Sequence, residues 1–197
     1  MRLLRPLPSD VRSVALLPAA YHPPTRAHEA LLEAALQYAG AAVAVLPRAL
    51  PHKEFDRIPF EARLSLIDLL ASHPNTTAGT TEGGLFVEIA REAREQFPTA
   101  EIWIVCGRDA AERIVAWDYS GQPPIEEQLN EFGILVAPRG THYQPPPALS
   151  HRIRQIPLDE NDQRISSTEL RELIAAGKPW THLTPARLHA PIARLYS

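Results

Sequence analysis

Cysteine is nearly absent from this 197-residue sequence, which contains only Cys106. A single cysteine excludes an internal disulfide framework and a cysteine-rich metal site. Because Cys106 ends the apolar run Ile102–Cys106, we expect a buried core thiol rather than a nucleophile. The histidines of the C-terminal half do not have metal-ligand spacing, so we predict no bound transition metal; they are His142, His151, His182 and His189.

Long apolar runs and an excess of positive charge are missing as well. No apolar run approaches the roughly 20 residues of a membrane-spanning helix, and the first residues, with two prolines by Pro8, do not resemble an export signal. The net charge of −3 gives no general attraction to nucleic acid or to anionic lipid. We therefore expect a cytoplasmic protein that binds neither nucleic acid nor membrane, and any phosphate binding must be local.

Short apolar runs alternate with segments of helical periodicity, which is typical of an α/β fold with a mainly parallel sheet. We expect buried strands at Val14–Leu17, Ala41–Leu46, Ile102–Cys106 and Gly133–Ala137. The periodicity predicts helices at about 27–38, 64–71, 86–97 and 167–176, followed by a final segment at 185–195. The length favours one domain, residues 1–197, with a small helical part from about residue 165 to residue 197.

The turn Pro23-Pro24-Thr25-Arg26-Ala27-His28, which follows the first strand, is a candidate phosphate site. In a parallel sheet, ligands bind beyond the carboxyl ends of the strands, where the free N–H groups of helix N-termini suit phosphate. Thr25 offers a hydroxyl, and His28 stands three residues later. The alternative is that Thr25 is only a helix N-cap and His28 a surface residue.

A second candidate phosphate site, Ile165-Ser166-Ser167-Thr168, has a more specific pattern. Three hydroxyl residues begin a helix, and Arg171 adds a forked donor for phosphate oxygens one turn later. The alternative is a capping box formed by Ser166 or Ser167 with Glu169 or Glu172. Both interpretations can hold, because a helix N-terminus is itself an anion site.

Together these segments resemble the HxGH-type nucleotidyltransferases, and within them the nicotinate (nicotinamide) mononucleotide adenylyltransferases of NAD synthesis. The resemblance runs in order through Tyr21–His28, Pro51-His52-Lys53, Cys106–Asp109 with Trp117, Val136–Gly140, Ile165–Arg171, and Leu183–Pro185 to Leu195-Tyr196. It implies a Rossmann-like, doubly wound parallel sheet with a small C-terminal helical part. It also implies two small-molecule substrates, ATP and a pyridine mononucleotide, and a Mg²⁺ ion held mainly by phosphates and water.

The resemblance implies specific roles for these residues. Thr25 and His28 would hold the ATP phosphates while the acceptor's 5′-phosphate attacks the α-phosphorus. Pyrophosphate would leave toward Ile165–Thr168, namely Ile165, Ser166, Ser167 and Thr168, and toward Arg171. Lys53 would add a mobile positive charge, and Gly107 and Asp109 would bind ATP, with Asp109 accepting from ribose hydroxyls. Trp117 would stack on the pyridine ring of the acceptor, which Ala20 and Tyr21 would also contact. Considered alone, Lys53 is a solvated side chain, Asp109 a helix N-cap and Trp117 a core aromatic.

The sequence also departs from the family pattern. Pro18, Ala19 and Ala20 stand where glycines and a small hydroxyl residue are usual, His22 replaces an Asp or Asn, and Ala27 replaces the glycine of HxGH. The segment at 84–87 lacks the Tyr and Thr that help to hold the pyridine nucleotide. These changes leave open another phosphorylated acceptor, or a nucleotide-binding protein without turnover. For His22 we favour a plain turn residue over a phosphate contact or a pH-sensitive group.

Overall fold

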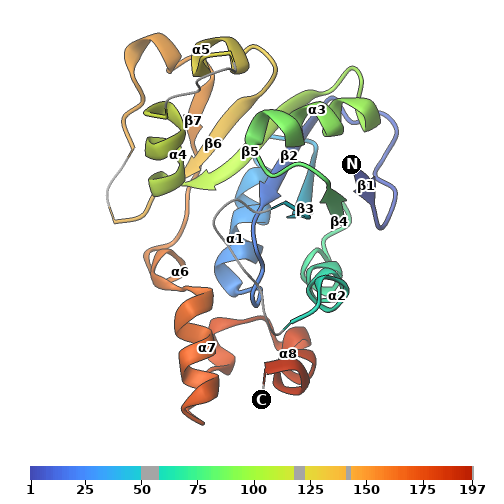
Figure 1. The fold of residues 1–197 in the computed structure, drawn as a ribbon, viewed down its shortest axis with the longest axis vertical. Coiled ribbons are helices and arrows are strands. Elements are labelled where there is room, and N and C mark those ends of the chain that lie inside the picture. Colours follow the sequence, from blue (N-terminus) through green and yellow to red (C-terminus); the bar gives the residue numbers. More distant parts are fainter. Residues whose placement is uncertain (50–57, 118–122, 141–142, 197) are drawn as a thin grey trace.

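The computed structural model describes residues 1–49, 58–117, 123–140 and 143–196, which form a sheet covered by helices on both faces (Figure 1). The strands are β1 (Arg2–Leu3), β2 (Ser13–Pro18), β3 (Ala41–Pro47), β4 (Thr76–Thr81), β5 (Glu101–Gly107), β6 (Gly133–Ala137) and β7 (Ile153–Gln155). Their order is β1-β4-β3-β2-β5-β6-β7. β1 runs antiparallel to β4, and the other neighbouring strands are parallel. The predicted parallel α/β sheet is therefore confirmed.

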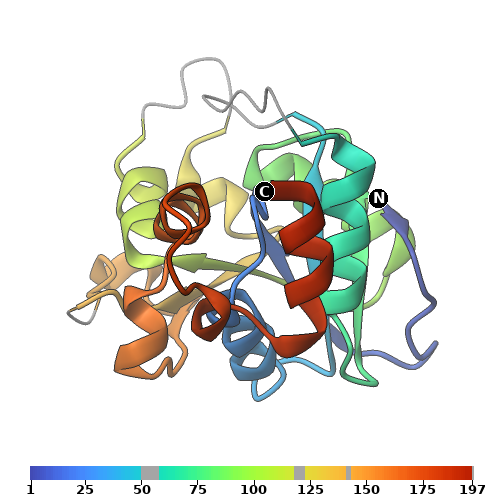
Figure 2. The ribbon, with the colours of Figure 1, turned by 90° about the horizontal axis from the view of Figure 1, so that it is seen from below.

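The helices form two layers. They are α1 (Arg26–Ala35), α2 (Phe60–Leu70), α3 (Phe86–Gln96), α4 (Arg108–Val115), α5 (Ile125–Gln128), α6 (Glu160–Arg164), α7 (Ser167–Ala175) and α8 (His189–Tyr196). Buried residues of α1, α2 and α8 share one core cluster, and those of α3, α4 and α5 share the other. α8 packs beside α2, so the C-terminal helix covers the same face as the first two helices (Figure 2). None of the described helices combines the length and apolarity needed to cross a membrane.

The four predicted strands are present, and each ends within a residue or two of its expected bounds. The sequence analysis missed β4, because its sequence Thr-Thr-Ala-Gly-Thr-Thr has no apolar run. Every residue of β4 is nevertheless buried, and three of its hydroxyls donate to backbone carbonyls: Thr76 to His73 at 2.8 Å, Thr77 to Arg5 at 3.1 Å, and Thr81 to Gly83 at 3.0 Å. Satisfied hydroxyls let these β-branched side chains serve as core residues.

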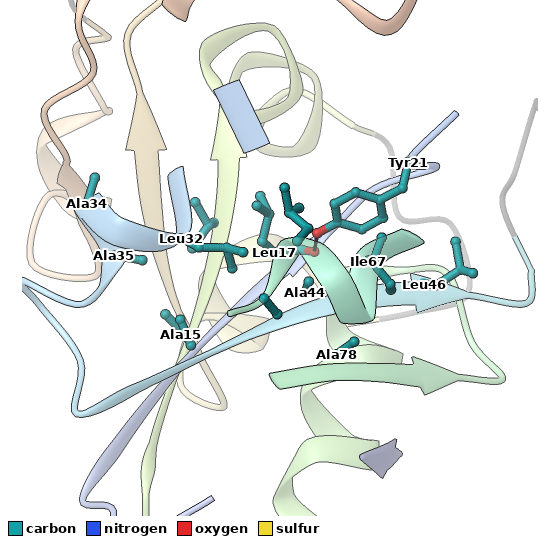
Figure 3. Packing of buried hydrophobic residues seen from close by; sticks show 14 of the residues in the cluster. Ala15, Leu17, Tyr21, Leu32, Ala34, Ala35, Ala44, Leu46, Ile67 and Ala78 are labelled. Atoms are coloured by element: carbon teal, nitrogen blue, oxygen red, sulfur yellow. Dashed lines mark hydrogen bonds between the residues drawn. The ribbon is translucent and has the colours of Figure 1, made fainter. Parts of the chain in front are cut away.

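The core reaches the end of β2 through Tyr21, whose side chain is 1% exposed. Figure 3 shows its ring among the aliphatic side chains that pack between the sheet and its helices, and its hydroxyl donates to the Leu17 carbonyl at 2.6 Å. Burial raises the pKa of Tyr21 well above its ordinary value. Cys106 is buried in the other cluster, and burial raises the pKa of its thiol to about 12, which confirms a core thiol.

Candidate functional site

The site lies where the winding of the sheet reverses. β2 and β5 are adjacent and parallel, but the chain continues from β2 to β3 on one side and from β5 to β6 on the other. α1 begins at Arg26, after β2, and α4 begins at Arg108, directly after β5. Two helix N-termini therefore lie at the carboxyl edge of the central strands, where doubly wound sheets bind their ligands.

Thr25 and His28 form a closed unit at the start of α1. Thr25 is the N-cap and is 1% exposed, and its backbone N–H donates to Nδ1 of His28 at 3.1 Å. The Thr25 hydroxyl lies 2.8 Å from the same ring nitrogen. Because Nδ1 is an acceptor here, a neutral His28 carries its proton on Nε2. The predicted N-cap is confirmed, while His28 is half-buried and bonded to the turn rather than exposed on the helix surface.

The second predicted turn begins α7. Ser166 is its N-cap, and the Ser166 hydroxyl accepts from the backbone N–H of Glu169 at 3.1 Å, which confirms Ser166 as the cap. Ser167 has a different partner, because its hydroxyl donates to the Pro23 carbonyl at 2.7 Å. This bond joins the second turn to the first across 144 residues of sequence.

Arg171 strengthens the same junction. Its Nη1 donates to the His22 carbonyl and to the Ser167 carbonyl, the latter at 3.2 Å, and its Nη2 donates to the Thr168 hydroxyl at 3.3 Å. The structure thus brings together the two turns that the sequence singled out. Thr25 and His28 lie on one side of the junction, and Ser166, Ser167, Thr168 and Arg171 lie on the other.

His22 lies in the first turn, as predicted, but its ring is also held in place. Its Nδ1 lies 2.9 Å from the Tyr196 hydroxyl, and the two ring centroids are 5.2 Å apart. Burial, together with the positive charges of Arg171 and Arg63, lowers the pKa of His22 to about 4. His22 is therefore a neutral group at pH 7.

The region after β5 corrects two of the alternatives drawn from the sequence. Gly107 is the N-cap of α4 and Asp109 lies in its first turn, so the interpretation of Asp109 as an N-cap is wrong. Oδ2 of Asp109 pairs with Nη1 of Arg139 at 3.2 Å. Trp117 is 59% exposed, so its interpretation as a core aromatic is also wrong. Beyond Arg139 lies a hollow of about 490 Å³, lined by Arg139, Gly140, Glu160, Gln163 and Arg164.

The remaining predicted residues are more dispersed. The carbonyl of Ala20 accepts from Nη1 of Arg63 at 2.9 Å. The Tyr21 side chain is buried in the core, so any contact of this residue with an acceptor comes from its backbone. Ile165 caps the C-terminus of α6 immediately before the second turn. The segment Pro51-His52-Lys53, and with it the predicted role of Lys53, lies outside the described residues.

Three residues at this site were missed by the reasoning from residue patterns. Thr184 is 3% exposed and its hydroxyl donates to the Pro24 carbonyl at 3.2 Å, and Tyr196 contacts His22. Arg63 is 5% exposed. The sequence contained one signal for it, because Arg63 lies on the buried stripe of α2 at the i, i+3, i+4 and i+7 spacing of Arg63, Leu66, Ile67 and Leu70. An arginine on such a stripe indicates a specific buried partner.

A doubly wound sheet with the N-terminus of α1 at its switch point, joined by hydrogen bonds to the hydroxyl-rich N-terminus of α7, is typical of a nucleotide-binding α/β protein. A family model described as Cytidylyltransferase-like matches residues 16–173. The chain belongs to this family and is a nucleotidyltransferase. The match includes both turns.

Individual proteins also resemble this chain, two of them in sequence and one in structure. The chain is 29% identical over 150 residues to a probable nicotinate-nucleotide adenylyltransferase of Thermus thermophilus, covering 73% of this chain and 75% of the relative. A protein of the same description from Chlorobaculum parvum is 28% identical over 107 residues, which cover 54% of this chain and 52% of that relative. The structure of the nicotinic acid mononucleotide adenylyltransferase of Plasmodium falciparum, complexed with NaAD, superposes with a TM-score of 0.70 at 17% identity, over 93% of this chain and 95% of that one. This structural similarity establishes the Rossmann-like fold.

Proposed function

We propose that this nucleotidyltransferase transfers AMP from ATP to nicotinate mononucleotide, giving a dinucleotide and pyrophosphate in a cytoplasmic step of NAD synthesis. The single observation that carries the proposal is the hydrogen-bonded junction of the Thr25–His28 turn with the Ser166–Arg171 turn at the switch point of the sheet. The relatives in Thermus thermophilus and Chlorobaculum parvum, both described as probable nicotinate-nucleotide adenylyltransferases, support the choice of acceptor.

The chemistry needs positioning and charge neutralisation rather than a covalent intermediate. An oxygen of the acceptor's 5′-phosphate attacks the α-phosphorus of ATP, and the bond from that phosphorus to the oxygen bridging to the β-phosphate breaks. Thr25 holds Nδ1 of His28 as an acceptor, so the Nε2–H of His28 donates to a phosphate oxygen. The N-terminus of α1 adds its positive dipole end.

The leaving pyrophosphate gains its negative charge beside α7. The N-terminal amides of this helix, with the hydroxyls of Ser166 and Thr168, donate to the pyrophosphate oxygens, and Ser167 takes part through its backbone N–H because its hydroxyl is bonded to the Pro23 carbonyl. The guanidinium of Arg171 has five N–H donors. The N–H groups that donate to His22, Ser167 and Thr168 fix the plane of the guanidinium. Its remaining N–H groups bind phosphate oxygens.

The metal in this proposal is a Mg²⁺ ion that enters with ATP. Among the described residues, no three histidine, cysteine or acidic side chains gather as a metal cage. Mg²⁺ keeps several waters and binds phosphate oxygens, so the ion would be held mainly by the triphosphate and water and would help to neutralise the phosphates. Lys53 would add a further positive charge from its loop.

Three other contacts complete the proposal. The carboxylate of Asp109 accepts hydrogen bonds from the ribose hydroxyls of ATP. These bonds either replace its present ion pair with Arg139 or form beside it. The exposed ring of Trp117 stacks on the pyridine of the acceptor. The backbone of Ala20 and Tyr21 borders the acceptor, because the Tyr21 side chain is committed to the core.

One observation favours a second candidate, transfer to a different phosphorylated acceptor. The loop after β4 stands where the family holds its pyridine nucleotide, and here its backbone amides bind the protein's own carboxylates. Glu92 accepts from Glu82 and Gly83 at 3.0 and 2.8 Å, and Glu88 accepts from Gly84 and Leu85 at 3.0 Å each. An acceptor without a pyridine carboxylate would leave these bonds undisturbed.

An acceptor panel tests the two candidates. Pyrophosphate release is measured with Mg-ATP and, in turn, nicotinate mononucleotide, nicotinamide mononucleotide, ribose 5-phosphate and glycerol 3-phosphate. We expect the highest kcat/KM with nicotinate mononucleotide, and loss of that activity in His28→Ala. Preference for a non-pyridine acceptor would establish the second candidate instead. ATP binding by calorimetry without turnover on any acceptor would reject both and indicate a nucleotide-binding protein without catalysis.

A further inference from the structure

The backbone of the first turn is held from outside by side chains far away in sequence. The carbonyls of His22, Pro23 and Pro24 accept from Arg171, Ser167 and Thr184, which all come from the C-terminal part. The carbonyl of Ala20 accepts from Arg63, which comes from α2. Arg63 therefore bonds to the start of the turn, close to the end of β2, whereas the C-terminal donors bond to residues 22–24.

Arg63 is unusual because it is an almost completely buried arginine. Its side chain lies on the core-facing stripe of α2 and packs against the ring of Phe60, with its Cζ 5.8 Å from the ring centroid. Removing a guanidinium from water is unfavourable, and an apolar side chain of similar shape at such a position is often at least as stable. Fold stability alone therefore does not account for an arginine here.

The bond from Arg63 lies beside the most constrained residue of the turn. Tyr21 has a φ of 47°, in the left-handed region that residues with a side chain seldom adopt. The Ala20 carbonyl belongs to the peptide that immediately precedes this residue. The Arg63 bond thus fixes the orientation of the Ala20–Tyr21 peptide.

Tyr21 in turn contacts the catalytic histidine. Its ring centroid lies 4.9 Å from that of His28, and its hydroxyl is anchored to the Leu17 carbonyl. Rotation of the Ala20–Tyr21 peptide would shift the Tyr21 ring, and with it the surface against which the His28 imidazole rests. A continuous path of direct contacts therefore runs from Arg63 through Ala20 and Tyr21 to His28.

We propose that Arg63 is a positioning residue for nucleotidyl transfer, fixing the Ala20–Tyr21 peptide so that His28 meets the phosphates in reactive geometry. The proposal rests on the proposed function. Arg63 acts through the turn, so its loss mainly lowers the rate of the chemical step and leaves the KM for ATP nearly unchanged. Because the backbone of Ala20 and Tyr21 borders the acceptor, the KM for the acceptor rises by at most about 3-fold.

The test compares Arg63→Met and Arg63→Lys with a matched control, Arg94→Met. Arg94 also donates to backbone carbonyls, those of Phe97, Pro98 and Ala100, but at the end of the sheet where β5 begins. We expect kcat to fall about 100-fold in Arg63→Met, with both KM values within about 3-fold of wild type. Arg63→Lys, which keeps a charged donor, should recover part of kcat. Arg94→Met should lower the melting temperature but leave kcat unchanged.

Three kinetic results would overturn the proposal: a kcat of Arg63→Met within about 3-fold of wild type, an equal loss of kcat in Arg94→Met, or a loss that appears only in KM. Should Arg63→Met fail to fold, Arg63→Lys decides alone. A fall of about 5- to 20-fold in kcat at unchanged KM supports the role, since lysine lacks the planar fork of arginine, and a wild-type kcat rejects it.

A second readout separates this proposal from the proposed function. Long-range ¹H–¹⁵N spectra of the histidine rings report the tautomer and surroundings of His28 without any substrate. We expect the His28 ring signals to shift in Arg63→Met and Arg63→Lys but not in Arg94→Met. If wild type makes no dinucleotide, the proposed function fails, while the ring signals still decide whether Arg63 positions His28. Unshifted His28 signals in both Arg63 variants would overturn the proposal.

Discussion

His28 and Arg171 lie on the two sides of the junction, and each is fixed by bonds to the turn; in the proposed function both bind the phosphates. Thr25 sets the tautomer of His28, while the carbonyls of His22 and Ser167 set the plane of the Arg171 guanidinium. We predict that His28→Ala and Arg171→Ala each lower kcat by about 100-fold or more, because their contacts strengthen as charge moves onto pyrophosphate. Steady-state kinetics with saturating ATP and acceptor measure this loss.

Trp117 should behave differently, because stacking stabilises the ground state and the transition state alike. We predict that Trp117→Ala raises the KM for the acceptor by about 2- to 10-fold with little change in kcat. Tyr38→Ala, which removes another partly exposed aromatic, is the control and should leave both constants unchanged. Similar effects of the His28, Arg171 and Trp117 variants on this KM would contradict the assigned roles.

His22 should make the stability of the protein depend on pH. Its pKa of about 4 in the folded protein lies below the ordinary value of 6.5, because burial and the charges of Arg171 and Arg63 disfavour its protonated form. The unfolded chain therefore binds the proton more readily, and the free energy of unfolding falls as the pH drops from about 6.5 toward 4. In protonated His22, Nδ1 carries a hydrogen, so the Tyr196 hydroxyl could only accept from it and not donate to it.

Denaturant unfolding of wild type and His22→Asn at pH 7, 6 and 5 measures this effect. We expect the difference in free energy of unfolding between the two proteins to shift in favour of the variant as the pH falls, since asparagine does not titrate. A difference that is constant across this range would show that the folded protein does not resist protonation of His22.

Among the secondary-structure elements, those with apolar or amphipathic sequences could be predicted. β2, β3, β5 and β6 have apolar runs, and α1, α3 and α7 have clear faces, so their existence followed from periodicity. β4 could not be found in this way, because its burial depends on hydroxyl bonds to carbonyls of other segments. The short strands β1 and β7 owe their form to strand pairing at the edges of the sheet.

The same distinction applies to the site. The two turns have recognisable local motifs, so Thr25, His28 and Ser166–Arg171 could be named from the sequence. Thr184 and Arg63 reach the site by hydrogen bonds to carbonyls of the turn, and carbonyls are present at every residue. Only the folded chain shows which carbonyl a distant donor reaches.

The pairing of β5 with β6 leads to a prediction about packing. Gly133 is directly opposite Trp103, and a Cβ at Gly133 would lie less than 3 Å from carbons of the Trp103 ring, which is 1% exposed. We predict that Gly133→Ala lowers the free energy of unfolding by about 1–3 kcal/mol through overpacking. Gly40→Ala is the control, because there a Cβ would meet only the Ser13 carbonyl, at 3.6 Å. Equal melting temperatures of Gly133→Ala and wild type would contradict this account of the core.

At the scale of the whole molecule, the C-terminal part is tied to the sheet at the candidate site. α8 packs beside α2 (Figure 2). Side chains of the C-terminal part contact the turn at 22–24, namely those of Ser167, Arg171, Thr184 and Tyr196. These contacts are the reason to expect that residues 1–197 unfold as one domain, although the sheet and the C-terminal helices are separate in sequence.

Tryptophan fluorescence can test this cooperativity. Trp117→Phe/Trp180→Phe leaves Trp103 in the sheet, and Trp103→Phe/Trp117→Phe leaves Trp180, which contacts His189 in the C-terminal part. In each protein we predict that the fluorescence transition coincides with the loss of helical circular dichroism. A Trp180 transition at lower denaturant than the circular dichroism of the same protein would instead indicate a C-terminal part that unfolds by itself.

The central claim is that the two joined turns transfer the adenylyl group of ATP to the phosphate of nicotinate mononucleotide. The most direct measurement is mass spectrometry of the products formed from Mg-ATP and an acceptor whose phosphate oxygens are labelled with ¹⁸O. The account predicts a labelled dinucleotide and unlabelled pyrophosphate in equal amounts, because an acceptor oxygen attacks the α-phosphorus. Absence of the dinucleotide, or ¹⁸O in the released pyrophosphate, would contradict it.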